Sequence, residues 1–219
     1  MKNIPRIFID TEIKSGDKIP LAKETAHYLG HVMRTHECLC FHSGKEFNAT
    51  MTEDSRFLII GNKTEHDDPT GDITLVFSPI KRVDDLINMA TQMGVKKLQP
   101  VITERTVAHH INWERMRKIA TEAAEQSNRN SVPEIAEPIL FKNLDLGNLA
   151  FADERAAYGK KLDEKIPDNI KNLLIGPEGG FSDAEFDALD NASAIGISLG
   201  KTILRAEVAA VVILGKTKL

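Results

Sequence analysis

The stretch LLIGPEGGFSDAEF, residues 173–186, decides the predicted fold because it joins a buried-strand pattern to the start of a helix. Its apolar run LLI is typical of a strand that is buried on both faces. The SDAE that follows is a capping box, in which Ser182 caps a helix and Glu185 reaches back from the third position. Three glycines and Glu178 therefore lie between the carboxyl end of a strand and the amino end of a helix. In an open α/β sheet, this is where ligands bind.

The glycines of this loop, Gly176, Gly179 and Gly180, leave room for a ligand to approach the backbone. A bound phosphate is disfavoured, because Glu178 would repel it and the loop contains no lysine. A tight turn that needs glycine for its positive φ is the structural alternative to a binding loop.

A second glycine-containing loop lies in ISLGKTILRAEVAAVVIL, residues 197–214. The predicted strand ends at Leu199 and Gly200, and the helix after it is apolar nearly all round, which predicts burial on both sides. Two such loops at neighbouring strand ends predict a single pocket. The GISLGKT in this region is similar to a phosphate-binding P-loop, but three residues stand where the motif needs four. The acidic strand LAFADE also precedes the loop, the reverse of the usual order, so nucleotide hydrolysis is disfavoured.

The chain has 219 residues, 42% of them apolar, which is enough for one large or two small domains. Cys38 and Cys40 lie too close in sequence to bridge easily, which fits a reducing compartment. No charged-then-apolar leader and no membrane-length apolar run is present, so we expect a cytoplasmic protein without a membrane partner. The net charge is −4, but residues 81–130 hold nine Lys and Arg against six Asp and Glu, so any phosphate-facing surface would be local.

The first 70 residues predict a small, mainly β domain. Its strand patterns are RIFID, KIPL, CLCFH, EFNATM and FLIIGN, interrupted by the helical pattern of AKETAHYLGHVMR. The polar segment EHDDPTG, residues 65–71, is the best linker candidate because it contains Pro and Gly. Strands and helices alternate over residues 71–219, and a helix capped by Asn112 is expected to run to about Arg129. This order predicts an α/β domain with a parallel sheet.

The two glycine loops together resemble the signature of the RsmE family of ribosomal RNA small-subunit methyltransferases. Two further blocks are similar to that family, MGVKKLQPVITERTV at 93–107 and ATEAAEQSNRNSVPEI at 120–135. The N-terminal IPRIFID and AHYLGHVMR are similar to the start of the family's PUA-like domain. The resemblance implies a SPOUT methyltransferase domain with a C-terminal trefoil knot over residues 71–219, preceded by a PUA-like β-barrel RNA-binding domain over residues 1–70.

By this resemblance, the protein transfers a methyl group from S-adenosylmethionine to N3 of a uridine in 16S ribosomal RNA near the decoding site. The resemblance also implies a homodimer, in which the last helix is buried against a second subunit, and the small ribosomal subunit or its RNA as partner. The two loops would wrap a bent cofactor, and the implied binding residues are Leu174, Gly176, Glu178, Gly179, Gly180, Leu199, Gly200, Ile203 and Leu204.

The chemistry of this reaction favours two residues at the start of the final helix. A sulfonium methyl is already electrophilic, so donor and acceptor need alignment rather than a metal. Uridine N3 carries a weakly acidic proton, which calls for a base and for a cation near the uracil oxygens. As a hypothesis, Arg205 stabilises the uracil anion or orients the base, and Glu207 holds Arg205 or accepts the proton. The alternative is an Arg–Glu pair that satisfies polar groups in a buried interface.

Phosphate contacts are expected from arginines of the β domain and of the basic middle region, above all from Arg6, Arg34, Arg105 and Arg129, and also from Arg115 and Arg117. An ordinary solvated surface position is the alternative for each of them. Such contacts would make RNA binding weaken as the salt concentration rises.

A zinc site is the other possibility that the sequence raises. His27 and His31 are one helical turn apart, and Cys38, Cys40 and His42 follow nearby. Alternate residues of a strand stand too far apart to share an ion without distortion, and no second Cys pair exists. We therefore expect no metal, and ordinary packing for these side chains.

The chain departs from the family's usual sequence near the loops, at Met89, Gln92, Lys201, Thr202, Ala206 and Val208. None of these departures removes a loop glycine or Arg205, so they affect the expected substrate contacts more than the cofactor site. Two alternative functions stay open: a methyltransferase of the same fold that acts on a different RNA position, and a non-catalytic protein that binds RNA or the ribosome.

Overall fold

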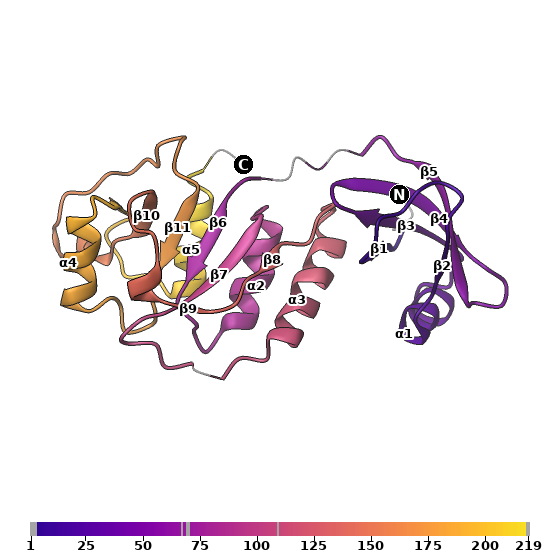
Figure 1. The fold of residues 1–219 in the computed structure, drawn as a ribbon, viewed down its shortest axis with the longest axis horizontal. Coiled ribbons are helices and arrows are strands. Elements are labelled where there is room, and N and C mark those ends of the chain that lie inside the picture. Colours follow the sequence, from indigo (N-terminus) through magenta and orange to yellow (C-terminus); the bar gives the residue numbers. More distant parts are fainter. Residues whose placement is uncertain (1–3, 67, 69–70, 109, 218–219) are drawn as a thin grey trace. The chain divides into compact units, whose positions relative to one another are not determined.

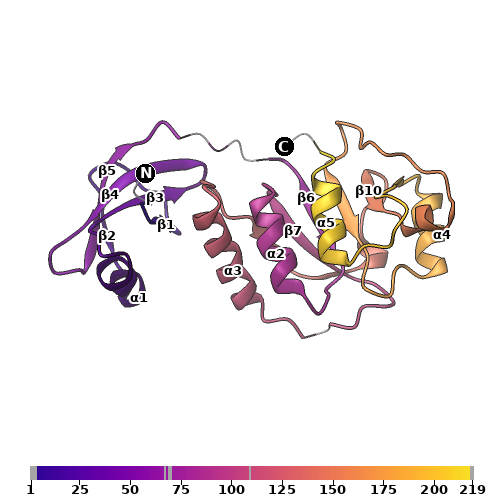
Figure 2. The same ribbon diagram turned by 180° about the vertical axis from the view of Figure 1, so that it is seen from behind.

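The computed structural model describes residues 4–66, 68, 71–108 and 110–217. The chain divides into two compact units, one formed by residues 1–70 with 121–132 and the other by residues 71–120 with 133–219 (Figures 1 and 2). Each unit has its own sheet. The first unit is thus built from two separate stretches of chain, which the sequence patterns did not predict.

A curled five-stranded sheet forms the first unit (Figure 1). Its strands are β1 (Arg6–Phe8), β2 (Lys18–Pro20), β3 (Glu37–His42), β4 (Lys45–Met51) and β5 (Phe57–Lys63), in the order β1-β3-β4-β5-β2. β1 is parallel to β3, and the other neighbours are antiparallel. β1 and β2 form two unpaired edges of the described sheet, so the sheet is curled but does not close into the predicted barrel. Helix α1 (Lys23–His27) continues into a π-helical turn, η1 (Tyr28–Met33), where the sequence predicted a helix.

The core of this unit follows from the period-two pattern of its strands. Phe47, Ala49 and Met51 alternate along β4 and are all buried. They belong to one core cluster with Leu29 of η1 and with Cys38, Cys40, Leu58 and Ile60 of the neighbouring strands. Both cysteines are unpaired thiols in this core. The hydrogen bond with Cys38, together with burial, raises the pKa of Cys40, so this thiol stays protonated and packs as a small apolar side chain.

Arg6 ties β1 to β4 and to the stretch 121–132 within the first unit. Its Nε and Nη2 donate hydrogen bonds to Oε2 of Glu46 at 3.0 and 2.8 Å. Its Nη1 donates to the carbonyl oxygen of Arg129 at 3.0 Å, and its Nη2 also donates to Oδ1 of Asn130. Arg6 and Glu46 are both buried, so this is an ion pair with its hydrogen bonds satisfied inside the protein.

The expectation that Arg6 and Arg129 contact RNA phosphates does not fit these positions. The guanidinium of Arg6 donates hydrogen bonds to Glu46, to the carbonyl oxygen of Arg129 and to Asn130. Arg129 is also buried, and its Nε lies 3.9 Å from Oδ2 of Asp68. Burial lowers the pKa of Arg129. Both side chains are therefore structural cations of the first unit, which the count of surface arginines in the sequence could not distinguish.

A seven-stranded sheet forms the second unit. Its strands are β6 (Thr74–Phe77), β7 (Lys97–Ile102), β8 (Glu134–Ile135), β9 (Ile139–Leu140), β10 (Leu149–Ala152), β11 (Asn172–Ile175) and β12 (Ile195–Ile197). Six of them follow the order β12-β10-β11-β6-β7-β8, and β9 pairs with β7. Every strand pairing in this described sheet is parallel, which confirms the predicted α/β fold class.

The helices of the second unit follow the expected alternation with strands. They are α2 (Val83–Gln92), α3 (Trp113–Gln126), α4 (Asp183–Asn191) and α5 (Ala206–Leu214), with short 3₁₀ turns η2 (Phe141–Asn143) and η3 (Glu154–Tyr158). Residues 113–120 of α3 belong to this unit. Oδ1 of Asn112 accepts a hydrogen bond from the N–H of Arg115 at 3.0 Å, which confirms the predicted cap. The helix ends before Arg129, its predicted end.

Helices cover both faces of this sheet. α2 and α5 pack together on one face, which is turned to the viewer in Figure 2. The other face carries an apolar cluster that includes Phe151, Leu174 and Phe181, closed by Leu189 of α4. Because parallel strands point the same way, the carboxyl ends of β10, β11 and β12 meet at one edge, with the two glycine loops. The trefoil threading of the C-terminal segment stays a prediction. None of the helices in the described ranges has the length and apolar composition of a membrane span.

Candidate active site

The capping box that the sequence predicts is present at the start of α4. Oγ of Ser182 accepts a hydrogen bond from the N–H of Glu185 at 3.3 Å, and Oε2 of Glu185 accepts one from the N–H of Ser182 at 2.9 Å. Oε1 of Glu185 accepts a third hydrogen bond, from the N–H of Glu104 at 2.9 Å. The glycine loop, residues 176–182, is thus fixed both to its own helix and to the segment after β7.

Arg105 also holds the glycine loop in place. Its Nη1 donates hydrogen bonds to the carbonyl oxygens of Gly179 and Phe181 at 3.0 and 3.1 Å. Gly180 has φ +67°, in the left-handed region that favours glycine. A β-carbon at Gly176 would lie 3.1 Å from the ring of Phe181, so that ring packs directly on the glycine backbone. The loop glycines therefore serve both turn geometry and close packing.

The second loop runs from the end of β12 to the start of α5. Gly200 has φ +118°, and its N–H donates to Oγ of Ser198 at 3.3 Å. Arg205 is the N-cap residue of α5, and Glu207 lies in the first turn of that helix. Apart from Glu207, the side chains of α5 are apolar, which fits the packing of this helix against α2 and β11.

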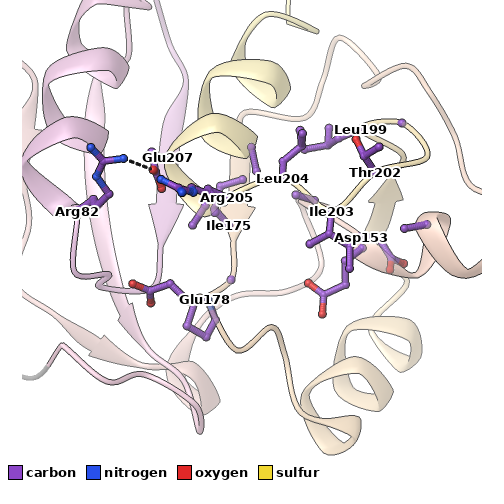
Figure 3. Close-up of a pocket in the computed structure, with 18 of the residues that line it drawn as sticks. Arg82, Asp153, Ile175, Glu178, Leu199, Thr202, Ile203, Leu204, Arg205 and Glu207 are labelled. Atoms are coloured by element: carbon purple, nitrogen blue, oxygen red, sulfur yellow. Dashed lines mark hydrogen bonds and ion pairs between the residues drawn. The ribbon is translucent and has the colours of Figure 1, made fainter.

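The two loops meet in one pocket of about 450 Å³ (Figure 3). Of the predicted cofactor residues, those that line it are Gly176, Glu178, Leu199, Gly200, Ile203 and Leu204. Arg205 and Glu207 line it as well. Leu174, Gly179 and Gly180 do not: Leu174 is fully buried in the core, and Gly179 packs against the side chain of Arg105. The prediction of a single pocket from two glycine loops thus agrees with the geometry.

A third wall of the pocket was missed by the sequence reasoning. It comes from the end of β10 and the turn η3, through Ala152, Asp153, Glu154 and Ala157. The signal was present in the acidic strand end LAFADE, which the sequence raised only as the acidic strand of a possible P-loop site. Lys81 and Arg82, just before α2, also line the pocket without any motif that marks them.

The charged side chains of the third wall form a network of ion pairs. The carboxylate of Asp153 is buried and lies 2.7 Å from Nη2 of Arg155, whose Nη1 lies 2.8 Å from Oδ2 of Asp190. Hydrogen bonds with Asp153 and Asp190 raise the pKa of Arg155, and the one with Arg155 lowers the pKa of Asp190. Glu154 has the opposite environment, because burial and then the charge of Asp153 raise its pKa.

Opposite charges meet at the other end of the pocket (Figure 3). Nη1 of Arg82 lies 3.4 Å from Oε1 of the buried Glu207. Glu178 accepts a hydrogen bond on Oε1 from the N–H of Lys81 at 2.8 Å. Arg205 is exposed, and its guanidinium makes no hydrogen bond with another described residue. This end of the pocket therefore presents the uncommitted guanidinium of Arg205 beside the buried carboxylate of Glu207.

The remaining predicted cations lie outside the pocket. Arg34 is exposed, with φ +53°, just after η1. Arg115 is exposed and paired with Asp84, and Nη2 of Arg117 lies 3.9 Å from Oε1 of Glu137. Of the departures from the family sequence, Thr202 and Ala206 line the pocket. The exposed positions among the others are Gln92, Lys201 and Val208, and Met89 is half-buried.

No group of metal-ligating side chains with metal-site geometry occurs among the residues that the structure describes. The rings of His27 and His31 instead stack on one another, with centroids 4.6 Å apart. His42 Nδ1 lies 2.8 Å from the carbonyl oxygen of Ile9. These contacts account for the histidines that raised the zinc alternative.

Comparisons with known proteins identify related RNA methyltransferases. Residues 66–218 match the family model of the RNA methyltransferase domain. The chain is 33% identical over 235 residues to ribosomal RNA small subunit methyltransferase E of Rickettsia conorii, covering 98% of this chain and 95% of that one. It is 26% identical to the protein of the same name from Bacillus subtilis, covering 93% and 92%.

A solved structure shares the fold of the whole chain. It is the crystal structure of a ribosomal RNA small subunit methyltransferase E from Neisseria gonorrhoeae bound to S-adenosylmethionine. The two chains are 27% identical with a TM-score of 0.83, over 97% of this chain and 96% of that one. The sequence and fold matches extend over nearly the whole chain. They show that the chain belongs to the RsmE family of ribosomal RNA small subunit methyltransferases.

Proposed function

We propose that this protein transfers the methyl group of S-adenosylmethionine to ribosomal RNA of the small subunit, and that the acceptor is N3 of a uridine in 16S RNA near the decoding site. The observation that carries the proposal is the single pocket in which both glycine loops converge with Arg205 and Glu207. Family membership supports the RNA substrate and the cofactor. The uridine and its N3 atom come from the family resemblance.

The pocket suits the cofactor in size and in lining. Its volume of about 450 Å³ is in the range of small-molecule sites. Ile175, Leu199, Ile203 and Leu204 give apolar surface for an adenosyl group, while Gly176 and Gly200 expose backbone. Four acidic side chains line the described pocket, which gives a cationic sulfonium more counter-charge than a phosphate would need. When bound, S-adenosylmethionine supplies an electrophilic methyl group on its sulfonium.

The residues at the Arg205 end have the types that the acceptor needs. Arg205 is exposed and caps α5, so its guanidinium can reach a uracil oxygen and stabilise the negative charge that develops there. Glu207 is buried and paired with Arg82, and in the described structure it makes no hydrogen bond or ion pair with Arg205. We assign Arg205 to charge stabilisation and base orientation, and Glu207 to acceptance of the N3 proton. Burial of Glu207 shields its carboxylate from bulk water.

RNA contacts outside the pocket are proposed for Arg34 in the first unit and for Arg105 beside the glycine loop. Arg34 is an exposed cation on the unit that carries the β domain, residues 1–70. Arg105 is exposed although its Nη1 binds loop carbonyls. The second unit, which includes most of residues 71–219, is proposed as the methyltransferase domain.

We also propose that the protein works as a cytoplasmic homodimer. Ile203 and Val208 flank the start of α5 and are 64% and 41% exposed, which leaves apolar surface beside the pocket. A second subunit seated there would cover both side chains. Sedimentation of the purified protein tests the dimer, and an Ile203→Asp variant that stays dimeric would contradict this interface.

The experiment that tests the function is methyl transfer from labelled S-adenosylmethionine to small ribosomal subunits from cells that lack this modification, followed by mapping of the labelled base. Label on uridine N3 supports the proposal. Label on another nucleotide would point to a different RNA position. Binding of cofactor without transfer to any RNA, or no binding of cofactor at all, would favour the non-catalytic protein.

A further inference from the structure

Four acidic side chains line the pocket within the described structure, and three of them have partners in the protein. Asp153 pairs with Arg155, Glu178 accepts the N–H of Lys81, and Glu207 pairs with Arg82. Glu154 is the fourth. Its carboxylate accepts no hydrogen bond from any described residue, although the side chain is half-buried.

The position of the Glu154 carboxylate is defined by the glycine loop. A β-carbon at Gly180 would lie 2.0 Å from Oε1 of Glu154 and 2.9 Å from its carboxyl carbon. The carboxylate thus occupies the space that any other residue at position 180 would fill. This contact joins the turn after β10, which forms the third wall of the pocket, to the glycine loop after β11.

Two cations whose charge acts on Glu154 make hydrogen bonds elsewhere. Arg155 is held between Asp153 and Asp190, and Arg105 donates to the carbonyl oxygens of Gly179 and Phe181. A carboxylate that is partly removed from water is stabilised when a hydrogen-bond donor faces it. Burial and the charge of Asp153 raise the pKa of Glu154, as expected for such a group.

We infer that Glu154 is a cofactor-recognition residue, whose carboxylate accepts hydrogen bonds from a donor group of bound S-adenosylmethionine. This inference rests on the proposed function. The cofactor has two groups with the required chemistry, the ribose diol and the α-ammonium. A carboxylate accepts two parallel hydrogen bonds from a diol, or charge-assisted bonds from an ammonium.

The test is calorimetric titration of the full chain with S-adenosylhomocysteine, the product form, which keeps both donor groups. Glu154→Ala is expected to weaken binding by about 10- to 100-fold, the usual effect of losing hydrogen bonds to a charged group. Glu154→Gln, which keeps the shape of the side chain, checks that packing is intact. Glu53→Gln changes an exposed glutamate of the other unit and serves as the matched control.

Two further ligands distinguish the donor groups. If Glu154 binds the ribose diol, wild type and Glu154→Ala bind the 2′,3′-dideoxy analogue of S-adenosylhomocysteine equally well. If Glu154 binds the α-ammonium, the two proteins bind 5′-methylthioadenosine equally well, because this ligand lacks the amino acid. The inference is overturned if Glu154→Ala binds S-adenosylhomocysteine as tightly as wild type. It is also overturned if the variant loses as much affinity for both probes as for S-adenosylhomocysteine. Failure of the wild-type protein to bind S-adenosylhomocysteine would instead overturn the proposed function.

Discussion

Arg82 and Glu207 join the start of α2 to the first turn of α5, with Nη1 of the arginine 3.4 Å from Oε1 of the glutamate. The side chain of Glu207 is 7% exposed and that of Arg82 is 57% exposed. The pair therefore places a buried carboxylate at the inner end of the pocket and its counter-charge at the surface. A carboxylate held this way has one fixed position when the substrate base arrives.

Removal of Arg82 is expected to destabilise the protein. In Arg82→Ala the buried Glu207 loses its partner, and the free energy of unfolding is expected to fall by about 1–3 kcal/mol. Arg115→Ala breaks an exposed pair with Asp84 and is the matched control, with an expected change of about 0–1 kcal/mol. Urea unfolding measures both. Equal stability losses in the two variants would show that burial of Glu207 does not matter.

Arg205→Ala is expected to lower the rate of methyl transfer by about 100- to 1000-fold, because the charge on the uracil oxygens loses its stabilising cation. The affinity for S-adenosylhomocysteine should stay within about twofold, since the cofactor is held by the loops. Single-turnover transfer and calorimetry separate these effects. Transfer at the wild-type rate would remove Arg205 from the mechanism, and Arg205→Lys tests whether charge alone suffices.

Arg105→Ala separates a loop-holding role from an RNA-binding role. Loss of the hydrogen bonds to Gly179 and Phe181 should loosen the glycine loop and weaken cofactor binding by about tenfold. A direct phosphate contact would instead reduce the slope of log K against log salt for RNA binding by about one. Cofactor titration and RNA binding at several salt concentrations measure the two. A variant with unchanged cofactor affinity would contradict the loop-holding role.

The pH dependence of stability is expected to report on Glu154. Burial and Asp153 raise its pKa above the ordinary value of 4.5, while Arg105 and Arg155 oppose that shift. The native state then holds its proton more tightly than the unfolded state, so stability falls as the pH rises from the unfolded pKa through the higher native pKa. Glu154→Gln removes this loss. The variant should melt higher than wild type at pH 7 and at the same temperature near pH 4. An equal difference at both pH values would contradict the environment described for Glu154.

Local patterns predicted much of the fold and part of the site. The capping box of Ser182 and Glu185, the cap at Asn112 and the parallel sheet all depend on residues near in sequence or on strand periodicity. The short strands β8 and β9 were missed, since each has two residues and no periodicity. Arg82 carries no local motif, and the acidic strand end did not reveal the role of Glu154, because both roles arise only when distant segments meet at Glu207 and Gly180.

The same distinction explains why the burial of two arginines was not predicted. Arg6 and Arg129 look like surface cations in the sequence, but Arg6 donates hydrogen bonds to the stretch 121–132 and both side chains are buried. A sequence pattern reports which faces of an element are apolar, but it does not report which distant carboxylate or carbonyl will accept a buried guanidinium.

The buried acceptors of Arg6 bear on the order in which the chain can fold as it is synthesised. Arg6 needs the carbonyl of Arg129 and the side chain of Asn130, which leave the ribosome only after β6, α2, β7 and α3. The first unit therefore cannot reach its final state before much of the second has emerged, contrary to the usual N-terminal-first sequence. A fragment of residues 1–70 should accordingly show faster amide exchange around Arg6 than the full chain. Nascent-chain folding of this protein is interleaved between its two units rather than sequential.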